Sequence, residues 1–194
     1  MRVIAGSAKG RRLRSVPGMD TRPTTDRVKE ALFSILNGRV NDAQFLDLYA
    51  GNGGIGIEAL SRGAAKAIFI DKSPLCTQMI RTNLSIVNFF DRSEVYTNDV
   101  LRALSILGKR KLVFDIIFLD PPYHQDLIGK TLRLISEYEL LASGGIVVVE
   151  HSKKEEITPE VLKLVRVRSE QYGDTVLGFY RHKEDSSENM CMSW

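Results

Sequence analysis

From residue 45 onward the chain alternates between short apolar runs and longer amphipathic segments, and this alternation restricts its possible folds most strongly. The runs FLDLY, AIFID, FDIIFLD and GIVVVEH have the length of β-strands and read as almost continuously apolar. Such strands, separated by helices, are typical of a parallel sheet covered on both faces. Strands are expected at 45–49, 67–71, 94–97, 114–120 and 145–151, and helices at 55–63, 74–90, 99–108 and 126–141.

The two ends of the chain depart from this alternation. Two weaker strands, 164–171 and 175–181, are expected around the turn Tyr-Gly-Asp. The polar residues 184–194 have few core-forming side chains and are expected to be disordered. Near the other end, an amphipathic helix is expected to follow Asp26, because apolar residues recur at helical spacing from Val28 to Leu36.

Composition excludes several classes of protein. The 194 residues, 43% of them hydrophobic, fit one soluble globular domain. No apolar run approaches the roughly 20 residues that a membrane-spanning helix needs. The basic start of the chain lacks the apolar segment of a secretory signal. Cys76 and Cys191 are too few for a zinc cluster or a disulfide framework, so no metal is expected and a cytoplasmic location is predicted.

Basic residues gather at the amino terminus. Residues 1–40 contain nine Lys/Arg against three acids, a net charge of +6, so the remaining chain carries −3. Segments 2–5 and 11–16 flank Gly-Ser-Ala-Lys-Gly and predict a β-hairpin. Clustered Lys/Arg favour a polyanionic partner through phosphate neutralisation and counterion release, although a solvated basic extension would have the same composition. The chain thus divides into an arm at 1–23, a domain at 24–183 and the tail.

A glycine-rich loop, Asp47 to Gly56, lies between the first strand of the alternation and its helix. Glycines let the backbone approach a ligand, and the helix N-terminus offers unpaired N–H groups. The pattern Gly51-x-Gly53-x-x-Gly56, with Asp71 20 residues after Gly51, literally matches the dinucleotide fingerprint. A nicotinamide-dependent dehydrogenase is therefore one alternative, and a plain tight turn with helix caps is another.

Acidic residues around this loop favour S-adenosylmethionine (SAM) over a dinucleotide. Asp47 would be unhelpful beside a pyrophosphate but suits the ammonium of a methionine moiety, directly or through water. Asp71 can accept both hydroxyls of a ribose. Asp99, after the third strand, can accept from an adenine amino group, or it can simply cap the next helix. Successive strand ends form the crevice where open α/β sheets bind ligands.

Asp120-Pro121-Pro122-Tyr123 follows the fourth strand on the same predicted edge. The amino group of a purine attacks a methyl group poorly, because its lone pair is delocalised into the ring. Asp120 and the Pro121 carbonyl can accept its two N–H groups and favour a directed lone pair, while the prolines fix the geometry. Tyr123 can stack on a flipped base. A simple turn after a strand would also explain the prolines.

Other polar residues are less informative. His151, after the fifth strand, can be a proton shuttle or a substrate contact, but a hydrogen-bonded histidine at a strand end is the simpler interpretation. Arg22, Thr24, Thr25 and Arg27 precede or begin the first helix. They can reach the rim of an active site, and the threonines can equally serve as caps.

Taken together, the segments RVIAGSAKGRRLRSVPG, RPTTDRVKEALFSIL, LDLYAGNGGIGIEALSRGA, FLDPPY and VVVEHS closely resemble the RsmD family. Its members are bacterial 16S ribosomal RNA (guanine-N2)-methyltransferases. The resemblance runs from Arg2 to about Lys183. The glycine loop is shared by many SAM enzymes, and the basic start with RPTTDRVKEALF is more particular. Asn52 and Tyr49 depart from the expected small residue and phenylalanine.

The resemblance implies the Rossmann-like class I SAM-methyltransferase fold, with seven mostly parallel strands, helices on both faces, an antiparallel last strand and the N-terminal β-hairpin. It implies SAM as methyl donor and 16S rRNA, in an assembling small ribosomal subunit, as substrate. By position, Asp47, Gly51 and Gly53 would line the methionine end of SAM, Asp71 the ribose and Asp99 the adenine. Asp120, Pro121 and Tyr123 would hold the guanine.

RNA phosphates would meet the basic residues of the arm and the first helix, which are Arg11, Arg12, Arg14, Arg22 and Arg27.

Two alternatives use the same fold. A DNA adenine-N6 methyltransferase shares the Asp-Pro-Pro-Tyr chemistry; the absence of an extra target-recognition domain in these 194 residues argues against this alternative but does not decide it. A non-catalytic RNA-binding assembly factor need not retain Asp47, Asp71 and Asp120.

Overall fold

The computed structural model describes residues 1–16, 26–122 and 126–188, and it divides the chain into two compact units, Met1–Asp99 and Val100–Trp194. The division falls inside the single domain that the sequence predicts over 24–183. Within the described residues there are eight strands, one more than expected, and the additional strand is only two residues long. None of the described helices has the length and apolar character needed to cross a membrane.

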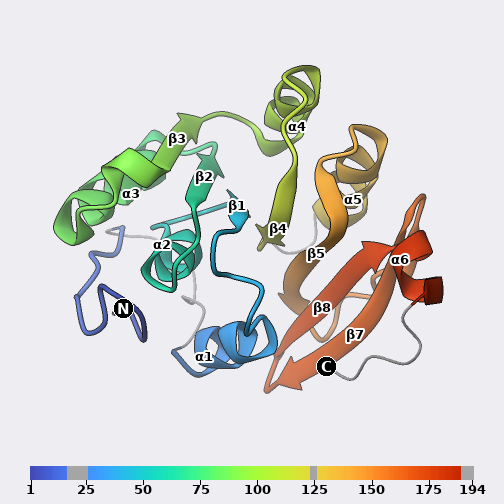
Figure 1. The fold of residues 1–194 in the computed structure, drawn as a ribbon, viewed down its shortest axis with the longest axis horizontal. Coiled ribbons are helices and arrows are strands. Elements are labelled where there is room, and N and C mark those ends of the chain that lie inside the picture. Colours follow the sequence, from blue (N-terminus) through green and yellow to red (C-terminus); the bar gives the residue numbers. More distant parts are fainter. Residues whose placement is uncertain (17–25, 123–125, 189–194) are drawn as a thin grey trace. The chain divides into compact units, whose positions relative to one another are not determined.

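The first unit is built on three parallel strands in the order β3-β2-β1 (Figure 1). These are β1 (Gln44–Leu48), β2 (Lys66–Asp71) and β3 (Ser93–Thr97). In register, Asp47 lies beside Phe69, and Asp71 lies beside Thr97. Because parallel strands end at the same edge, the loop after β1, the end of β2 and residues 98–99 share one edge of this sheet.

Three α-helices and one short 3₁₀-helix accompany these strands, namely α1 (Asp26–Ile35), α2 (Gly54–Ser61), α3 (Pro74–Val87) and η1 (Phe90–Arg92). Helix α3 starts where expected, because Pro74 occupies its first turn and the Ser73 hydroxyl accepts a hydrogen bond from the Cys76 N–H at 3.4 Å. It ends three residues before the predicted end. Asn88 takes the left-handed conformation there, with φ 58°, and closes the helix.

The second unit carries five strands in the order β4-β5-β8-β7-β6, of which the first four are labelled in Figure 1. They are β4 (Phe114–Leu119), β5 (Leu141–Ser152), β6 (Glu160–Val161), β7 (Leu164–Tyr172) and β8 (Thr175–His182). β4 and β5 are parallel, whereas β8 is antiparallel to β5, which confirms the predicted antiparallel last strand. The helices of this unit are α4 (Val100–Lys109), α5 (Leu127–Glu137) and α6 (Lys183–Glu188).

Two boundaries in the second unit differ from the expectation. β5 begins at Leu141 rather than 145, because a register shift between Phe114 and Ile116 accommodates the Ser-Gly-Gly segment within the strand. Residues 184–188, expected to be disordered, belong to α6. The Asp185 carboxylate anchors this helix by accepting the Gly144 N–H at 2.8 Å. Residues 189–194 of the predicted tail lie outside the described residues.

The amino-terminal segment contains one isolated antiparallel bridge, Arg2 to Arg12, in place of two regular hairpin strands. Its loop turns onto α2 instead of extending away, since the Ser7 N–H donates to the Ser61 carbonyl at 2.8 Å. Gly6 makes this approach possible. It has a φ of 80°, and a Cβ on it would lie 1.8 Å from the Ser61 carbonyl oxygen.

Candidate active site

Asp47 lies near the end of β1 and joins that strand to the start of α2. Its side chain is buried, and its Oδ2 accepts the Gly56 N–H at 2.8 Å. Gly56 is one of the first residues of α2, whose initial N–H groups have no partner within the helix. A Cβ on Gly56 would lie 2.3 Å from the Phe69 ring and 3.0 Å from Asp47 Oδ2. Only glycine therefore permits this approach between strand and helix.

The environment of Asp47 changes its ionisation. Burial raises the pKa of Asp47 to about 8, the Gly56 hydrogen bond opposes this rise, and the nearby Asp71 charge adds to it. The carboxyl is thus largely protonated at neutral pH when no cation lies beside it. An ammonium group would favour its ionised form. Sequence reasoning placed Asp47 near such a group but could not foresee its burial.

The glycine loop adopts left-handed backbone at three positions, Tyr49, Gly51 and Gly53, with φ of 59°, 56° and 79°. Gly53 is the N-cap of α2. A Cβ on Gly51 would meet nothing within 4 Å, so the backbone there faces open space that a ligand can approach. Asn52 Oδ1 accepts the Gly54 N–H at 3.1 Å. The side-chain oxygen of Asn52 therefore stabilises the loop.

Asp71, at the end of β2, holds this loop in place. Its Oδ2 accepts the Gly51 N–H at 2.9 Å, and its Oδ1 accepts the Ser73 N–H at 2.8 Å. Each carboxylate oxygen has a second lone pair, so these bonds leave capacity for the hydroxyls of a ribose. Asp71 therefore supports the loop, and its contact to a ribose stays a prediction. The sequence pattern did not indicate this bracing.

Asp99 and its neighbour Asn98 follow β3. The Asn98 N–H donates to the Asp71 carbonyl at 3.0 Å, which ties the ends of β2 and β3 together. Asp99 is exposed and directly precedes α4. This position suits a helix cap as well as a contact to an adenine, so both alternatives remain. The first unit thus brings Asp47, Gly51, Gly53 and Asp71 to one edge, with Asp99 at the same edge.

The second unit carries the Asp-Pro-Pro segment directly after β4. Asp120 is half-buried, Pro121 is buried and Pro122 is exposed. Leu119 pairs with Val149 of the parallel strand β5, so Glu150 and His151 lie at the same strand ends as Asp120. Tyr123 lies outside the described residues, and its predicted stacking role stays a prediction.

His151 is buried and has a defined tautomer. Its Nδ1 lies 2.8 Å from the Ser152 carbonyl oxygen, which can only accept, so Nδ1 carries the proton. Nε2 is buried and has no hydrogen-bond partner in the described part of the chain. Burial lowers the pKa of this histidine and so favours its neutral form. The Ser152 contact fits the simpler interpretation of a polar residue satisfied at a strand end, although one nitrogen stays unsatisfied.

Two buried polar residues that sequence reasoning missed anchor the amino-terminal segment, and the first is Glu58 of α2. Its carboxylate accepts the N–H groups of Ile4 at 2.8 Å and Ala5 at 3.0 Å. It also contacts Arg62 Nε at 2.8 Å and Lys29 Nζ at 3.4 Å. The side chains of Glu58 and Lys29 are fully buried. A charge within the apolar helix sequence IGIEALS was the one available signal.

The second is Ser61, one turn further along α2. Its hydroxyl donates to the Ala5 carbonyl at 2.6 Å and accepts the Ala8 N–H at 2.9 Å. With the segment held in this way, Val3, Ala8 and Leu13 are buried. The predicted phosphate-binding residues Arg11, Arg12 and Arg14 are exposed, as is Arg27 in α1. Arg22, Thr24 and Thr25 lie outside the described residues.

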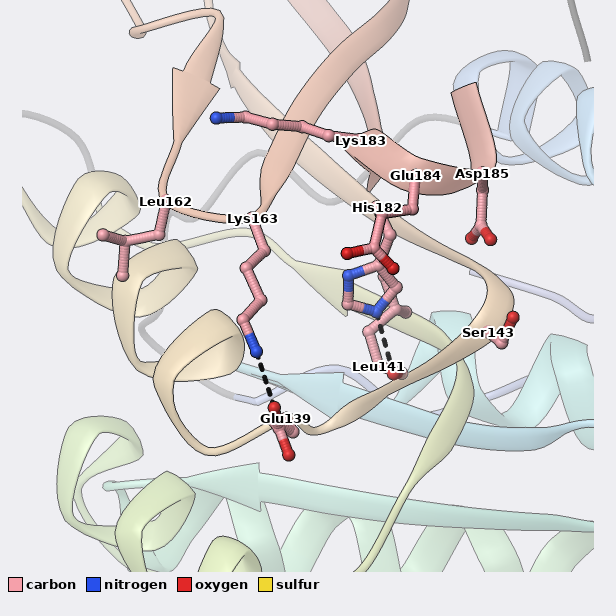
Figure 2. Close-up of a pocket in the computed structure, with 9 residues that line it drawn as sticks. All are labelled: Glu139, Leu141, Ser143, Leu162, Lys163, His182, Lys183, Glu184 and Asp185. Carbon is pink, nitrogen blue, oxygen red and sulfur yellow. Dashed lines mark hydrogen bonds and ion pairs between the residues drawn. The ribbon is translucent and has the colours of Figure 1, made fainter. Parts of the chain in front are cut away.

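A separate pocket opens in the second unit at the opposite end of β5 (Figure 2). Lys163 Nζ lies 2.6 Å from Glu139 Oε1, and His182 Nε2 is hydrogen-bonded to the Leu141 carbonyl oxygen at 3.0 Å. Figure 2 marks both contacts by dashed lines. Leu141 begins β5, whereas His151 lies near its end. The pocket therefore lies at the end of β5 away from His151 and Asp120. Its lining combines acidic and basic side chains and contains none of the predicted site residues.

Solved structures define the class of this fold. The methyltransferase-type protein YhhF of Escherichia coli superposes with a TM-score of 0.82 at 30% identity, covering 94% of this chain and 97% of that one. A methylase-type protein of Haemophilus influenzae gives a TM-score of 0.77 at 28% identity, covering 94% and 98%. The chain has the class I methyltransferase fold.

Sequence relatives narrow this class to one family. YlbH of Bacillus subtilis, provisionally named an rRNA methyltransferase, is 44% identical over 94% of this chain and 100% of its own length. Ribosomal RNA small subunit methyltransferase D of Escherichia coli is 37% identical over 77% of this chain and 74% of its own. The family described as "Conserved hypothetical protein 95" matches residues 1–181. The chain belongs to this family, the RsmD family, which confirms the resemblance found in the sequence.

Proposed function

We propose that the protein transfers a methyl group from SAM to the exocyclic N2 amino group of a guanine in 16S rRNA. One observation carries the proposal. In a member of the RsmD family, the Asp120-Pro121 pair directly follows a parallel strand, with a half-buried carboxylate beside a buried proline. The proposed substrate is the RNA of an assembling small ribosomal subunit in the cytoplasm. The name of a relative, ribosomal RNA small subunit methyltransferase D, supports small-subunit rRNA as the substrate class.

The residues of the first unit fit SAM. Gly51 leaves open space beside its backbone, Asp71 retains lone pairs for two ribose hydroxyls, and Asp47 is a buried acid whose ionised form needs a cation. Asp47, Gly51 and Gly53 would hold the methionine end, and Asp99 would meet the adenine. When bound, SAM supplies an electrophilic methyl group on a sulfonium.

Residues of the second unit would hold the target amino group and prepare it for methylation. Asp120 and the Pro121 carbonyl would accept its two N–H groups, which gives the nitrogen a directed lone pair for an in-line attack on the methyl group. The buried Pro121 ring limits the movement of this acceptor pair. Asp120 is also the candidate to receive the proton that leaves the methylated nitrogen, directly or through water. Tyr123 would stack on the flipped guanine.

RNA binding is assigned to the exposed arginines. Arg11, Arg12 and Arg14 project from a backbone that Glu58 and Ser61 anchor, and Arg27 projects from α1. These side chains would contact RNA phosphates and orient the enzyme without recognising the base sequence of the RNA. Arg22 completes the predicted set.

Labelled SAM incubated with unmodified small ribosomal subunits, followed by digestion of the RNA to nucleosides, tests the proposal. Label in N2-methylguanosine is the expected result. In a parallel incubation with unmodified DNA, label in N6-methyladenine would instead identify an adenine methyltransferase. Absence of label from every nucleic acid would indicate an assembly factor or another enzyme class.

The role of Asp120 is tested by Asp120→Ala, which should lower the methylation rate by about 100-fold or more while SAM still binds. Asp115→Ala is the matched control, because Asp115 is an exposed aspartate on β4, the strand that Asp120 follows. Near wild-type methylation by Asp120→Ala would refute the assignment.

A further inference from the structure

A fully buried asparagine, Asn83 of α3, makes three hydrogen bonds with its side-chain amide. Its Oδ1 accepts the Arg14 N–H at 2.8 Å, and its Nδ2 donates to the Arg14 carbonyl at 3.0 Å. The same Nδ2 donates to the Asn52 carbonyl at 2.9 Å. Both N–H donors of the amide are thus committed to backbone carbonyls.

The two segments that meet at Asn83 have different tasks in the proposed reaction. Arg14 belongs to the basic amino-terminal segment, 69 positions from Asn83, whereas Asn52 lies between the two glycines of the cofactor loop, 31 positions away. One side chain therefore connects the backbone that presents the arginines to the backbone that would hold SAM. The residue before Asn52, Gly51, is held by Asp71.

Only an amide of this length satisfies the three partners. The Arg14 N–H needs an acceptor, and the two carbonyls need donors, so the orientation of the Asn83 amide is determined by its contacts. An aspartate would keep the acceptor for Arg14 but would turn an oxygen toward two carbonyl oxygens. Loss of the donors would leave two carbonyls short of a partner in a partly buried position.

We propose that Asn83 is a positioning residue that couples RNA binding at Arg11, Arg12 and Arg14 to SAM binding at the glycine loop. The inference rests on the proposed function. RNA bound to the arginines favours the arm position in which Arg14 is bonded to Asn83, and through Asn83 it favours the loop conformation in which the Asn52 carbonyl accepts the second N–H. By thermodynamic linkage, the cofactor must strengthen RNA binding by the same factor.

The fold supplies a reason why Asn83 can be altered without loss of the whole segment. Residues 4–8 remain attached to α2 through Glu58 and Ser61, whichever residue stands at 83. A substitution at Asn83 releases only the connection between Arg14 and Asn52. Thermal unfolding of each variant checks that the fold is retained.

The test measures the affinity of the full chain for unmodified small ribosomal subunits, with and without saturating S-adenosylhomocysteine, the unreactive product of methyl transfer. Wild-type protein should bind the subunits about tenfold more tightly with the product present, a typical size for coupling between two sites. In Asn83→Asp this ratio should fall to about one. Asn88→Asp makes the same chemical change at the exposed end of the same helix and should keep the wild-type ratio.

The ratio separates positioning from a purely structural role, because a general loss of stability weakens both measurements equally. A wild-type ratio of one would overturn the coupling, even if labelled SAM still methylates the subunits. A ratio of about ten in Asn83→Asp would overturn the role of Asn83. If wild-type protein neither binds nor methylates the subunits, the proposed function fails and the coupling fails with it.

Discussion

Replacing Glu58 by glutamine tests how strongly the amino-terminal segment is attached to α2. The Glu58 carboxylate serves four donors, the N–H groups of Ile4 and Ala5 and the side chains of Arg62 and Lys29. An amide keeps one acceptor oxygen and presents an NH₂ group to the donors on its other side. At least one backbone N–H then loses its partner, and the fully buried Lys29 loses its neutralising charge.

The expected cost follows from these losses. Leaving a buried donor without a partner costs about 1–3 kcal/mol, and breaking a buried ion pair by removing one member costs about 3–5 kcal/mol. The two costs are not additive, because both arise from the loss of the same carboxylate. Glu58→Gln should therefore lower the free energy of unfolding by about 3–5 kcal/mol. Burial already lowers the pKa of Lys29, against the opposing attraction of Glu58, which shows that desolvation acts at this site.

Urea unfolding at neutral pH measures the effect. With a slope of about 2 kcal/mol per molar urea, the midpoint should fall by about 2 M. Glu139→Gln is the control, because its pair with Lys163 is exposed and should leave the midpoint unchanged within resolution. Adding Lys29→Met to Glu58→Gln removes the unpaired charge and should restore part of the stability. A loss below about 1 kcal/mol in Glu58→Gln would refute the reasoning.

Two further predictions concern the cofactor edge and the arginines. The pKa of Asp47 lies near 8 in the folded protein, above its ordinary value of 3.8, so the native state binds more protons than the unfolded state and wild-type stability falls as pH rises between these values. Asp47→Asn does not titrate and should therefore gain thermal stability relative to wild type between about pH 5 and 8; a constant difference would contradict this. Replacing Arg11, Arg12 and Arg14 together by alanine should reduce the slope of log K for RNA against log salt by about 2, at roughly 0.7 for each phosphate that is no longer neutralised. An unchanged slope would remove these side chains from the RNA interface. The triple substitution is a more specific test than deletion of residues 1–20, because the deletion would also remove the backbone N–H groups that donate to Glu58.

The strand–helix alternation predicted most of the fold because its signals are local. A continuous apolar run such as FDIIFLD predicts a buried strand from its own residues. Ser73 and Pro74 likewise predict the start of α3, because the cap and the first turn involve only neighbouring residues. The acidic residues at strand ends were also predictable. Parallel strands bring their carboxyl ends to one edge, so Asp47 and Asp71 meet as a consequence of topology.

The interactions that stabilise the site were not predictable from the sequence, because they join residues far apart along the chain. Glu58 meets Ile4 across 54 positions, and Asn83 meets Arg14 across 69. Nothing near Asn83 in the sequence distinguishes it from an exposed helix residue. The hairpin expectation also followed a local pattern, whereas hydrogen bonds to α2 determined the actual path of residues 4–8.

If the amino-terminal segment binds RNA as proposed, its anchoring restricts the kind of RNA that it can recognise. Its charges are presented by a backbone that is already fixed to α2 before RNA arrives. A flexible tail would adapt to almost any phosphate chain and would lose conformational entropy on binding. A fixed array loses little, but it is matched only by phosphates that are themselves held at the right spacing. Folded RNA within a ribosomal particle offers such spacing, and naked, unfolded transcript does not.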